Sequence, residues 1–199
     1  MLWQMAWRQE HNILMTHEEH VHLIKKAITN KGGTWADFGS GDGAFTLALR
    51  DLAGPLARIF SIDKDDNRLR TQEKAFEEKF SSFDVRFIKK DFTEQINLPE
   101  LDGILMANSL HYVQEQVPFL TKIRDLLKSN GKLILVEYNT EEGNQWVPYP
   151  VSFAKFEKLA ENAGYIDTEL LEKVPSTHWN EMYAAQAIAP SLFSSEFFK

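Results

Sequence analysis

Short apolar runs alternate with longer amphipathic segments along the chain, and this alternation predicts a mostly parallel β-sheet with helices on both faces. Five apolar runs have the length of strands: residues 34–38, 57–62, 84–88, 101–107 and 132–138. Two further strand-like stretches, 167–174 and 182–188, are joined by too few residues for a crossover helix. We therefore expect these last two strands to be antiparallel neighbours in an α/β sandwich of three layers.

Capping residues and glycines mark where helices begin and end. Thr16 and Glu19 form a capping box, and the amphipathic helix that follows is stopped at Gly32 and Gly33. Later amphipathic segments predict helices over residues 43–53, 66–79, 114–128 and 152–163.

The chain has the length of one domain with a full hydrophobic core. We expect an N-terminal helical cap or lid (1–32), an α/β core (33–189) and a tail (190–199). No apolar run approaches the roughly 20 residues that cross a bilayer, and the N-terminus lacks the basic and apolar regions of a signal peptide. A cytoplasmic location without membrane contact is the matching expectation.

A glycine-rich loop follows the first predicted strand: Asp37-Phe38-Gly39-Ser40-Gly41-Asp42-Gly43. Glycines permit a tight turn with positive φ and a close approach of ligand to backbone, and the helix that follows offers free N–H groups. Such runs also occur in ordinary turns. The position between a buried strand and a helix is what predicts a ligand here.

Acidic residues follow the next two strands. Asp63 ends the second, where nucleotide-binding α/β folds place a carboxylate that accepts ribose hydroxyls. Its alternative role is to cap the next helix, although Asp65 and Asp66 are available for that. Asp91, just beyond the third strand, would lie beside an adenine ring with Phe92 packed near it; an ordinary turn aspartate is the alternative.

The charge of the loop discriminates between cofactors. Gly39, Gly41 and Ala44 also fit the looser dinucleotide pattern, but Asp37 and Asp42 bracket the loop. No Lys or Arg lies near it in the sequence before Arg50, so a pyrophosphate would meet two carboxylates. S-adenosylmethionine has no phosphate and carries an ammonium group, whose attraction to a carboxylate is on the order of several kcal/mol.

These motifs together resemble class I S-adenosylmethionine-dependent methyltransferases of the small-molecule branch. The resemblance covers residues 33–138 and includes Asn108-Ser109-Leu110-His111-Tyr112-Val113 after strand four and 126–133 before strand five. It implies a Rossmann-like sheet of seven strands with one antiparallel strand near the C-terminus. It also implies methyl transfer to an O, N, S or C acceptor, with S-adenosylhomocysteine as product.

The resemblance also implies the cofactor site. Its residues are Asp37, Phe38, Gly39, Ser40, Gly41, Asp63, Lys64, Asp91, Phe92 and Asn108. The glycine loop would hold the methionine part, Asp63 and Lys64 the ribose, and Asp91 and Phe92 the adenine. Asn108 would line the pocket near the methionine.

The acceptor side is less defined by the sequence. His111, and secondly Glu137, are the candidates for a general base; His111 could instead bond the backbone at the start of a helix. Tyr112, Trp146 and Tyr149 are the candidate substrate-binding residues, with His178 and Trp179 in a later loop. The same loop aromatics could also be structural anchors, and Trp3 and Trp7 could belong to a lid.

Composition narrows the partners. The chain has no cysteine, which excludes disulfides, thiolate nucleophiles and cysteine-based zinc sites. A net charge of −7 and the lack of a Lys/Arg cluster favour a small-molecule acceptor over nucleic acid. His17 and His20 lie three apart on one helical face, but nothing nearby completes a metal site, so we predict none.

Two alternatives stay open at this point. The first is an NAD(P)-dependent oxidoreductase, which the acidic loop disfavours. The second is a protein that binds S-adenosylmethionine without turnover and acts as a partner or regulatory subunit.

Overall fold

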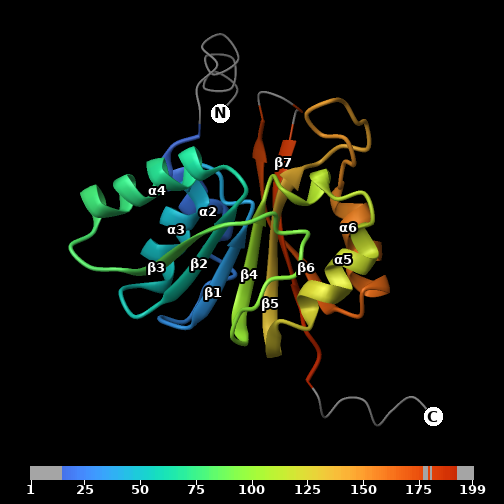
Figure 1. The fold of residues 1–199 in the computed structure, drawn as a ribbon. Helices are drawn as coiled ribbons and strands as arrows, with labels where there is room; N and C mark the ends of the chain where they lie inside the picture. Colours follow the sequence, from blue (N-terminus) through green and yellow to red (C-terminus); the bar gives the residue numbers. More distant parts are fainter. Residues whose placement is uncertain (1–14, 177–178, 180, 192–199) are drawn as a thin grey trace.

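The computed structural model describes residues 15–176, 179 and 181–191. In this part of the chain, seven strands form one sheet in the order β3-β2-β1-β4-β5-β7-β6 (Figure 1). The strands are β1 (Thr34–Phe38), β2 (Arg58–Asp63), β3 (Asp84–Lys89), β4 (Leu101–Ala107), β5 (Leu127–Tyr138), β6 (Ile166–Pro175) and β7 (Glu181–Ile188). Strand β7 is antiparallel to both neighbours, β5 and β6. The predicted mostly parallel sheet with one antiparallel strand is confirmed.

Helices cover both faces of the sheet. On one side lie α2 (His17–Ile24), α3 (Ala44–Ala53) and α4 (Asp66–Lys79), and on the other α5 (Gln116–Arg124) and α6 (Phe153–Asn162) (Figure 1). Each side has its own apolar core. Leu49 of α3 packs with Ile59 and Ile134 on the first side, whereas Phe119 of α5 and Phe156 of α6 pack on the second.

Local capping chemistry behaves as the sequence predicts. Thr16 and Glu19 form the capping box of α2. Asp65 caps α4 by accepting from the backbone N–H groups of Asn67 and Arg68, and Ser152 caps α6. These bonds satisfy amide groups that a helix N-terminus otherwise leaves without partners.

Two predicted helix ends are wrong. Helix α2 ends at Ile24 instead of Gly32, although Ala27 and Ile28 beyond it are buried. Helix α5 ends at Arg124 instead of continuing to Lys128, and β5 begins at Leu127, which pairs with Leu101 of β4. Because this pairing buries Leu127 and gives its backbone sheet partners, it prevails over the local helical periodicity.

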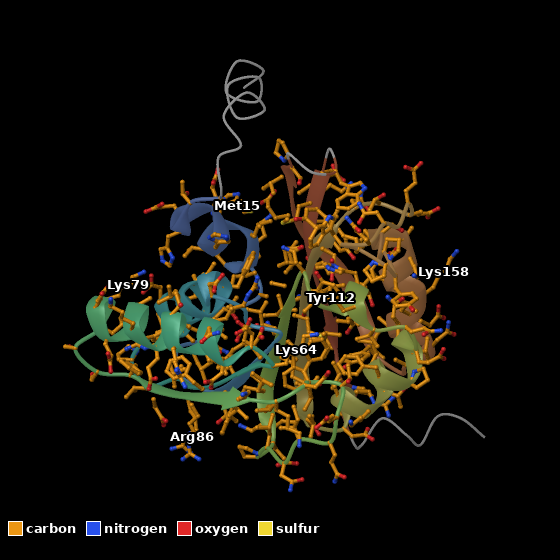
Figure 2. The ribbon with its side chains drawn as sticks, turned by 45° about the horizontal axis from the view of Figure 1, so that its top comes forward. Met15, Lys64, Lys79, Arg86, Tyr112 and Lys158 are labelled. Atoms are coloured by element: carbon orange, nitrogen blue, oxygen red, sulfur yellow. The ribbon has the colours of Figure 1, made fainter. Side chains whose placement is uncertain are left out.

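The sheet order creates a crevice at one edge. Strand β1 has β2 on one side and β4 on the other. The connections after β1 therefore build the sheet first toward β2 and β3, and then, from β4 onward, on the opposite side of β1. In open α/β sheets, ligands bind outside the carboxyl ends of the strands at this switch point. Figure 2 brings that edge forward, with Lys64 and Tyr112 near its middle. None of the described helices is long and apolar enough to cross a membrane.

Candidate active site

A cavity of about 1170 Å³ opens at the carboxyl ends of the parallel strands. Pockets for single ligands are typically about 300–1,000 Å³, so this cavity is larger than one ligand requires. It combines residues that follow β1, β2, β3, β4 and β5 with residues of two later loops. The described lining residues are Gly39, Asp63, Lys64, Asp65, Arg68, Asp91, Phe92, Thr93, Asn108, Ser109, His111, Tyr112, Tyr138, Asn144, Trp146, Val147 and Trp179.

The glycine loop forms the floor of the cavity beside β4. Gly39 has a φ of 77°, and a Cβ built on it would lie 2.6 Å from the Cβ of Ser109. Ser109 is itself fixed, because its hydroxyl donates to the carbonyl of Phe38 at 2.7 Å. Only glycine permits this backbone to pass so close to the turn after β4.

The other loop residues support this surface from behind. Asp37 and Phe38 are buried and do not line the cavity. The Ser40 hydroxyl lies 2.7 Å from that of Ser61 on β2. Gly41 donates its N–H to Asp63 at 2.8 Å, which ties the loop to the end of β2. Of the five loop residues predicted to bind the cofactor, Gly39 is the one that lines the cavity.

Asp63 lies in the cavity and keeps capacity for a ligand. Its two carboxylate oxygens accept one backbone N–H each, from Gly41 and from Asp65 at 2.8 and 2.9 Å. A carboxylate has about four lone-pair sites, so two remain for hydroxyl donors. The helix after β2 is capped by Asp65, as the sequence allowed, and not by Asp63.

Asp91 and Phe92 lie together beyond β3. Asp91 takes part in a turn, because one of its oxygens accepts from both the N–H and the hydroxyl of Thr93. These bonds lower the pKa of Asp91, so the carboxylate is ionised at neutral pH. Its second oxygen has no partner in the described part of the chain and faces a cavity that Phe92 also lines. The turn role and the ligand role are therefore compatible.

Two buried acceptor atoms near the loop lack a donor among the described residues: Oδ1 of Asn108 and Oδ1 of Asp37. Asn108 has a φ of 50°, lines the cavity and directly follows β4. A buried acceptor without a partner costs about 1–3 kcal/mol. A ligand in the cavity that carries N–H donors, such as an ammonium group, would satisfy the Asn108 oxygen, so this residue fits S-adenosylmethionine.

The glycine loop is not surrounded by acidic groups alone, which corrects the expectation from the sequence. Arg68 of α4 lines the cavity, and one of its guanidinium nitrogens would lie 3.3 Å from a Cβ built on Gly41. A cation therefore lies beside the glycine loop, although none is near it in the sequence. The first turn of α4 brings Arg68 there because α4 starts directly after β2, next to the loop.

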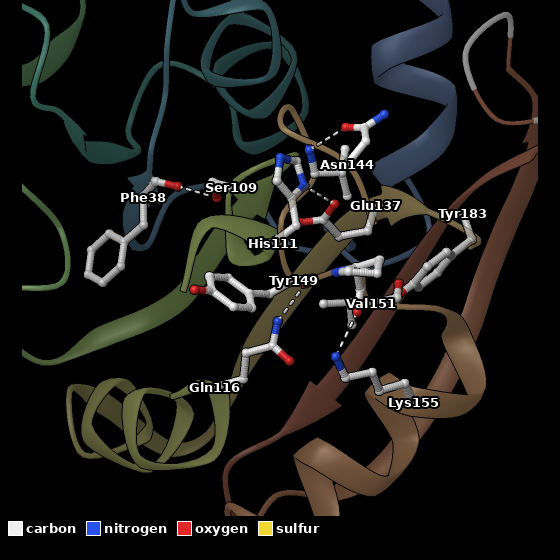
Figure 3. A network of polar contacts seen from close by, with 12 residues as sticks. Phe38, Ser109, His111, Gln116, Glu137, Asn144, Tyr149, Val151, Lys155 and Tyr183 are labelled. Carbon is white, nitrogen blue, oxygen red and sulfur yellow. Dashed lines mark hydrogen bonds and ion pairs between the residues drawn. The ribbon is translucent and has the colours of Figure 1, made fainter. Parts of the chain in front are cut away.

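The two candidate bases form one buried pair. Nδ1 of His111 lies 2.6 Å from Oε2 of Glu137, and the His111 backbone N–H donates to Oε1 of the same carboxylate at 3.2 Å (Figure 3). The side chains are 2% and 1% exposed, so the pair is shielded from bulk water. His111 belongs to the short 3₁₀ helix η1 (Leu110–Tyr112) after β4, and Glu137 is near the end of β5. Parallel pairing of β4 with β5 brings the two together.

Aromatic rings surround the cavity on the β5 side. Tyr112 and Trp146 line it as predicted, and Trp179 joins them by contacting Tyr138 at 5.1 Å between ring centroids. The sequence analysis missed Tyr138, although its position at the end of a central strand was a usable signal.

Tyr149 does not line this cavity. Its ring lies in a separate, smaller recess with Lys155 and Lys158, and its hydroxyl donates to Gln114. Its backbone N–H donates to the carbonyl of His111, so it anchors the loop after β5. Tyr149, unlike Tyr112 and Trp146, is therefore not among the residues that could contact an acceptor in this cavity.

The described N-terminal residues lie away from the cavity. Helix α2 packs on α3 and β6, and none of residues 15–32 lines the cavity. His17 is held by Asp51 and Lys79 at 2.6 and 2.7 Å, and His20 packs edge-on against Phe45. These histidines fasten α2 to the core. Trp3 and Trp7, the proposed lid residues, and His178 lie outside the described residues.

This combination of fold and site is that of a nucleoside-binding methyltransferase. The chain belongs to a methyltransferase domain family, whose model matches residues 29–187. Its methyl donor is S-adenosylmethionine. The alternative of an NAD(P)-dependent oxidoreductase is thereby excluded.

Curated relatives are similar over part of their length. A ubiquinone/menaquinone biosynthesis C-methyltransferase from Shewanella frigidimarina is 25% identical over 121 residues, which cover 60% of this chain and 48% of that protein. A probable cobalt-precorrin-6B C(15)-methyltransferase from Methanothermobacter thermautotrophicus is 28% identical over 110 residues, covering 55% and 54%. The chain thus spans about half the length of these two relatives.

Solved structures show the same fold. An S-adenosylmethionine-dependent methyltransferase from Aquifex aeolicus aligns with a TM-score of 0.67 and 18% identity, covering 88% of this chain and 100% of that one. Phosphoethanolamine N-methyltransferase 2 from Haemonchus contortus, solved with phosphomonomethylethanolamine and S-adenosylhomocysteine, aligns with a TM-score of 0.71 and 14% identity, covering 87% and 53%.

Proposed function

We propose that this methyltransferase acts on a small molecule whose acceptor atom loses a proton to His111. The observation that carries the proposal is the buried His111–Glu137 pair, of which His111 lines the same cavity as residues of the cofactor motifs. When bound, S-adenosylmethionine supplies a methyl group already activated by its sulfonium. The protein's task is to bind, orient and deprotonate the acceptor while excluding water.

The geometry of the cavity supports the proposed roles of the cofactor residues. Asp63 accepts the ribose hydroxyls through its two remaining lone-pair sites, with Lys64 beside it. Asp91 accepts from the adenine amino group, and Phe92 packs on the ring. Asn108, which lines the cavity, provides an unsatisfied acceptor for the ammonium of the methionine part, and Asp37 supports the loop from behind. Gly39, Phe38, Ser40 and Gly41 shape the loop that supports it.

Glu137 orients His111 for proton transfer. Because Nδ1 of the imidazole is bound to the carboxylate, the neutral ring carries its proton there and leaves the Nε2 lone pair available. A second bond, from the His111 backbone to Glu137, fixes the ring relative to β5. Glu137 also stabilises the imidazolium that forms when His111 takes a proton. His111 is therefore the general base, and Glu137 is a positioning residue.

A small acceptor fits the cavity better than a polymer. The space beyond the cofactor residues is bordered by aromatic side chains, and the chain carries a net charge of −7. Relatives named for carbon acceptors and a neighbour that methylates nitrogen leave the acceptor atom to experiment. The single domain, the N-terminal lid and a cytoplasmic location stay predictions.

The protein without cofactor is expected to lose stability as pH rises toward 7. Burial, together with the nearby charge of Asp63 and opposed by the Thr46 hydroxyl, raises the pKa of Asp37 from 3.8 to about 7. The folded state therefore holds a proton that the unfolded chain has released between these two values. The contribution of Asp37 is fully present below about pH 4 and falls by about 1.4 kcal/mol per pH unit up to about pH 7.

Urea unfolding of the wild type and of Asp37→Asn, from pH 5 to pH 8, measures this effect. Asparagine keeps an acceptor for Thr46 but does not ionise, so the variant gains stability relative to the wild type as pH rises. A difference in unfolding free energy that is constant across this range would show that Asp37 is ionised throughout.

Calorimetry and methyl transfer together test the proposed function. We expect S-adenosylhomocysteine to bind and NAD to produce no heat. Incubation with S-adenosylmethionine labelled in its methyl group should then label at least one member of a panel of phenols, thiols, amines and carbon acids. The proposal fails if S-adenosylhomocysteine does not bind, or if transfer to the labelled acceptor is unchanged in His111→Asn.

A further inference from the structure

The lining of the cavity is divided by charge. The charged residues in it are Asp63, Lys64, Asp65, Arg68 and Asp91, and all of them follow β2 or β3. The described residues that line it from β5 and the two later loops are Tyr138, Asn144, Trp146, Val147 and Trp179, and none of them carries a charge. We call this second set, together with Tyr112, the aromatic half.

The rings of the aromatic half come from four separate segments. Tyr112 is in η1, Tyr138 ends β5, Trp146 lies in the loop before α6, and Trp179 lies between β6 and β7. Burial, with the nearby charge of Glu137, raises the pKa of Tyr138, so its hydroxyl stays neutral. Segments far apart in the sequence thus converge to present rings without charge.

The backbone at Trp146 is held by hydrogen bonds, although the residue is exposed. Trp146 is 68% exposed, and Oδ1 of Asn144 accepts from the backbone N–H groups of Trp146 and Val147 at 2.8 and 3.0 Å. The Asn144 N–H donates back to the carbonyl of Val147, whose side chain is buried. Tyr112 on the other side is 55% exposed. Contiguous exposed aromatic surface beside a cavity is typical of a ligand-binding site.

His111 lies where the two halves meet. Its Nδ1 is occupied by Glu137, whereas Nε2 has no partner among the described residues and His111 lines the cavity. A molecule stacked on the rings would have one edge against this base. An anion in the same place would find no oppositely charged residue among the described residues of the aromatic half to offset its loss of water.

We propose that the acceptor is a planar, uncharged aromatic molecule with one ionisable hydroxyl, stacked in the aromatic half with that hydroxyl on Nε2 of His111. The inference rests on the proposed function and specifies its substrate class. The hydroxyl proton passes to Nε2 as the oxygen's electron pair forms the bond to the methyl carbon. The electron pair of the broken carbon–sulfur bond stays on sulfur, which yields S-adenosylhomocysteine and the methyl ether.

Four matched probes test the class. They are 2-naphthol, its saturated analogue 2-decalol, the doubly charged 2-naphthyl phosphate and the cationic 2-naphthylmethylamine. Equilibrium dialysis measures their binding to the protein saturated with S-adenosylhomocysteine, so binding is read without turnover. We expect 2-naphthol to bind at least tenfold more tightly than the other three and to be the probe that yields a labelled methyl ether.

Substitutions in the aromatic half then test whether 2-naphthol binds there. Trp146→Ala and Tyr112→Ala should each weaken 2-naphthol binding about tenfold, and Trp146→Phe should restore most of it, while the affinity for S-adenosylhomocysteine stays within twofold. Tyr149→Phe, an aromatic change in the neighbouring recess, is the control and should have no effect. A Trp146→Ala protein that fails to fold is replaced by Trp146→Leu, which keeps apolar bulk without a ring.

Three outcomes overturn the inference: tighter binding of a charged or saturated probe, equal binding by the ring variants, or no labelled ether. In each of them normal binding of S-adenosylhomocysteine leaves the cofactor assignment intact. Loss of that binding in the wild type would instead overturn the proposed function itself.

Discussion

Replacing His111 by asparagine lowers the turnover number for methyl transfer by a factor of about 10²–10⁴, the range that general-base catalysis contributes. The reason is that Nε2 of His111 is the accepting atom in the cavity, positioned by a buried carboxylate 2.6 Å from Nδ1. Asparagine keeps a polar group near Glu137 but has no lone pair of suitable basicity at the Nε2 position. The measurement is the single-turnover rate with a labelled methyl donor.

Two controls distinguish a loss of proton transfer from a general disturbance of the structure. The affinity of His111→Asn for S-adenosylhomocysteine should stay within about twofold of the wild type, because His111 is not among the residues assigned to the cofactor. Glu137→Gln should give an intermediate rate and a shifted pH profile, because glutamine still holds the ring but does not stabilise the imidazolium. An unchanged rate in both variants would make the pair purely structural.

Replacing Asp63 by alanine weakens the binding of S-adenosylhomocysteine by a factor on the order of 10², because hydrogen bonds to a charged group contribute about 1.5–3 kcal/mol each. The variant removes the acceptor for the ribose hydroxyls. It also frees the N–H of Gly41, which Asp63 holds at 2.8 Å, so the glycine loop loses its tie to β2. Calorimetric titration gives the dissociation constant.

Asp66→Ala is the matched control for this experiment. Asp66 carries the same charge three residues away, pairs with Arg70 on the outside of α4 and does not line the cavity. Its loss should leave the dissociation constant within twofold of the wild-type value. If both variants weaken binding equally, general electrostatics explain the effect and Asp63 has no direct contact with the ligand.

The order and type of the elements followed from local chemistry. The capping box of Thr16 and Glu19 and the glycines after helices marked helix ends. The apolar runs predicted six of the seven strands with small errors at their ends. The seventh, β5, begins five residues earlier than predicted because Leu127 pairs with Leu101. Leu101 is 26 positions from Leu127, so interactions between residues close in sequence do not reveal this pairing. The start of β5 is therefore set by the sheet.

The sequence by itself also predicted which strand ends border the cavity. Asp63, Asp91 and Asn108 end or follow neighbouring parallel strands, and parallel strands bring their carboxyl ends to one edge. Glycine at position 39 is likewise readable, because a loop between a strand and a helix needs positive φ. Periodicity and turn chemistry act through neighbouring residues, which is why these features were accessible without a structure.

The tertiary structure alone decided how the side chains meet. It paired His111 with Glu137, brought Arg68 to the glycine loop, joined Tyr138 to Trp146 and Trp179 around the cavity, and placed Tyr149 outside it. These outcomes depend on rotamers, loop paths and the register of β4 on β5. Such quantities are set by packing between segments distant in the chain, so no local pattern in the sequence encodes them.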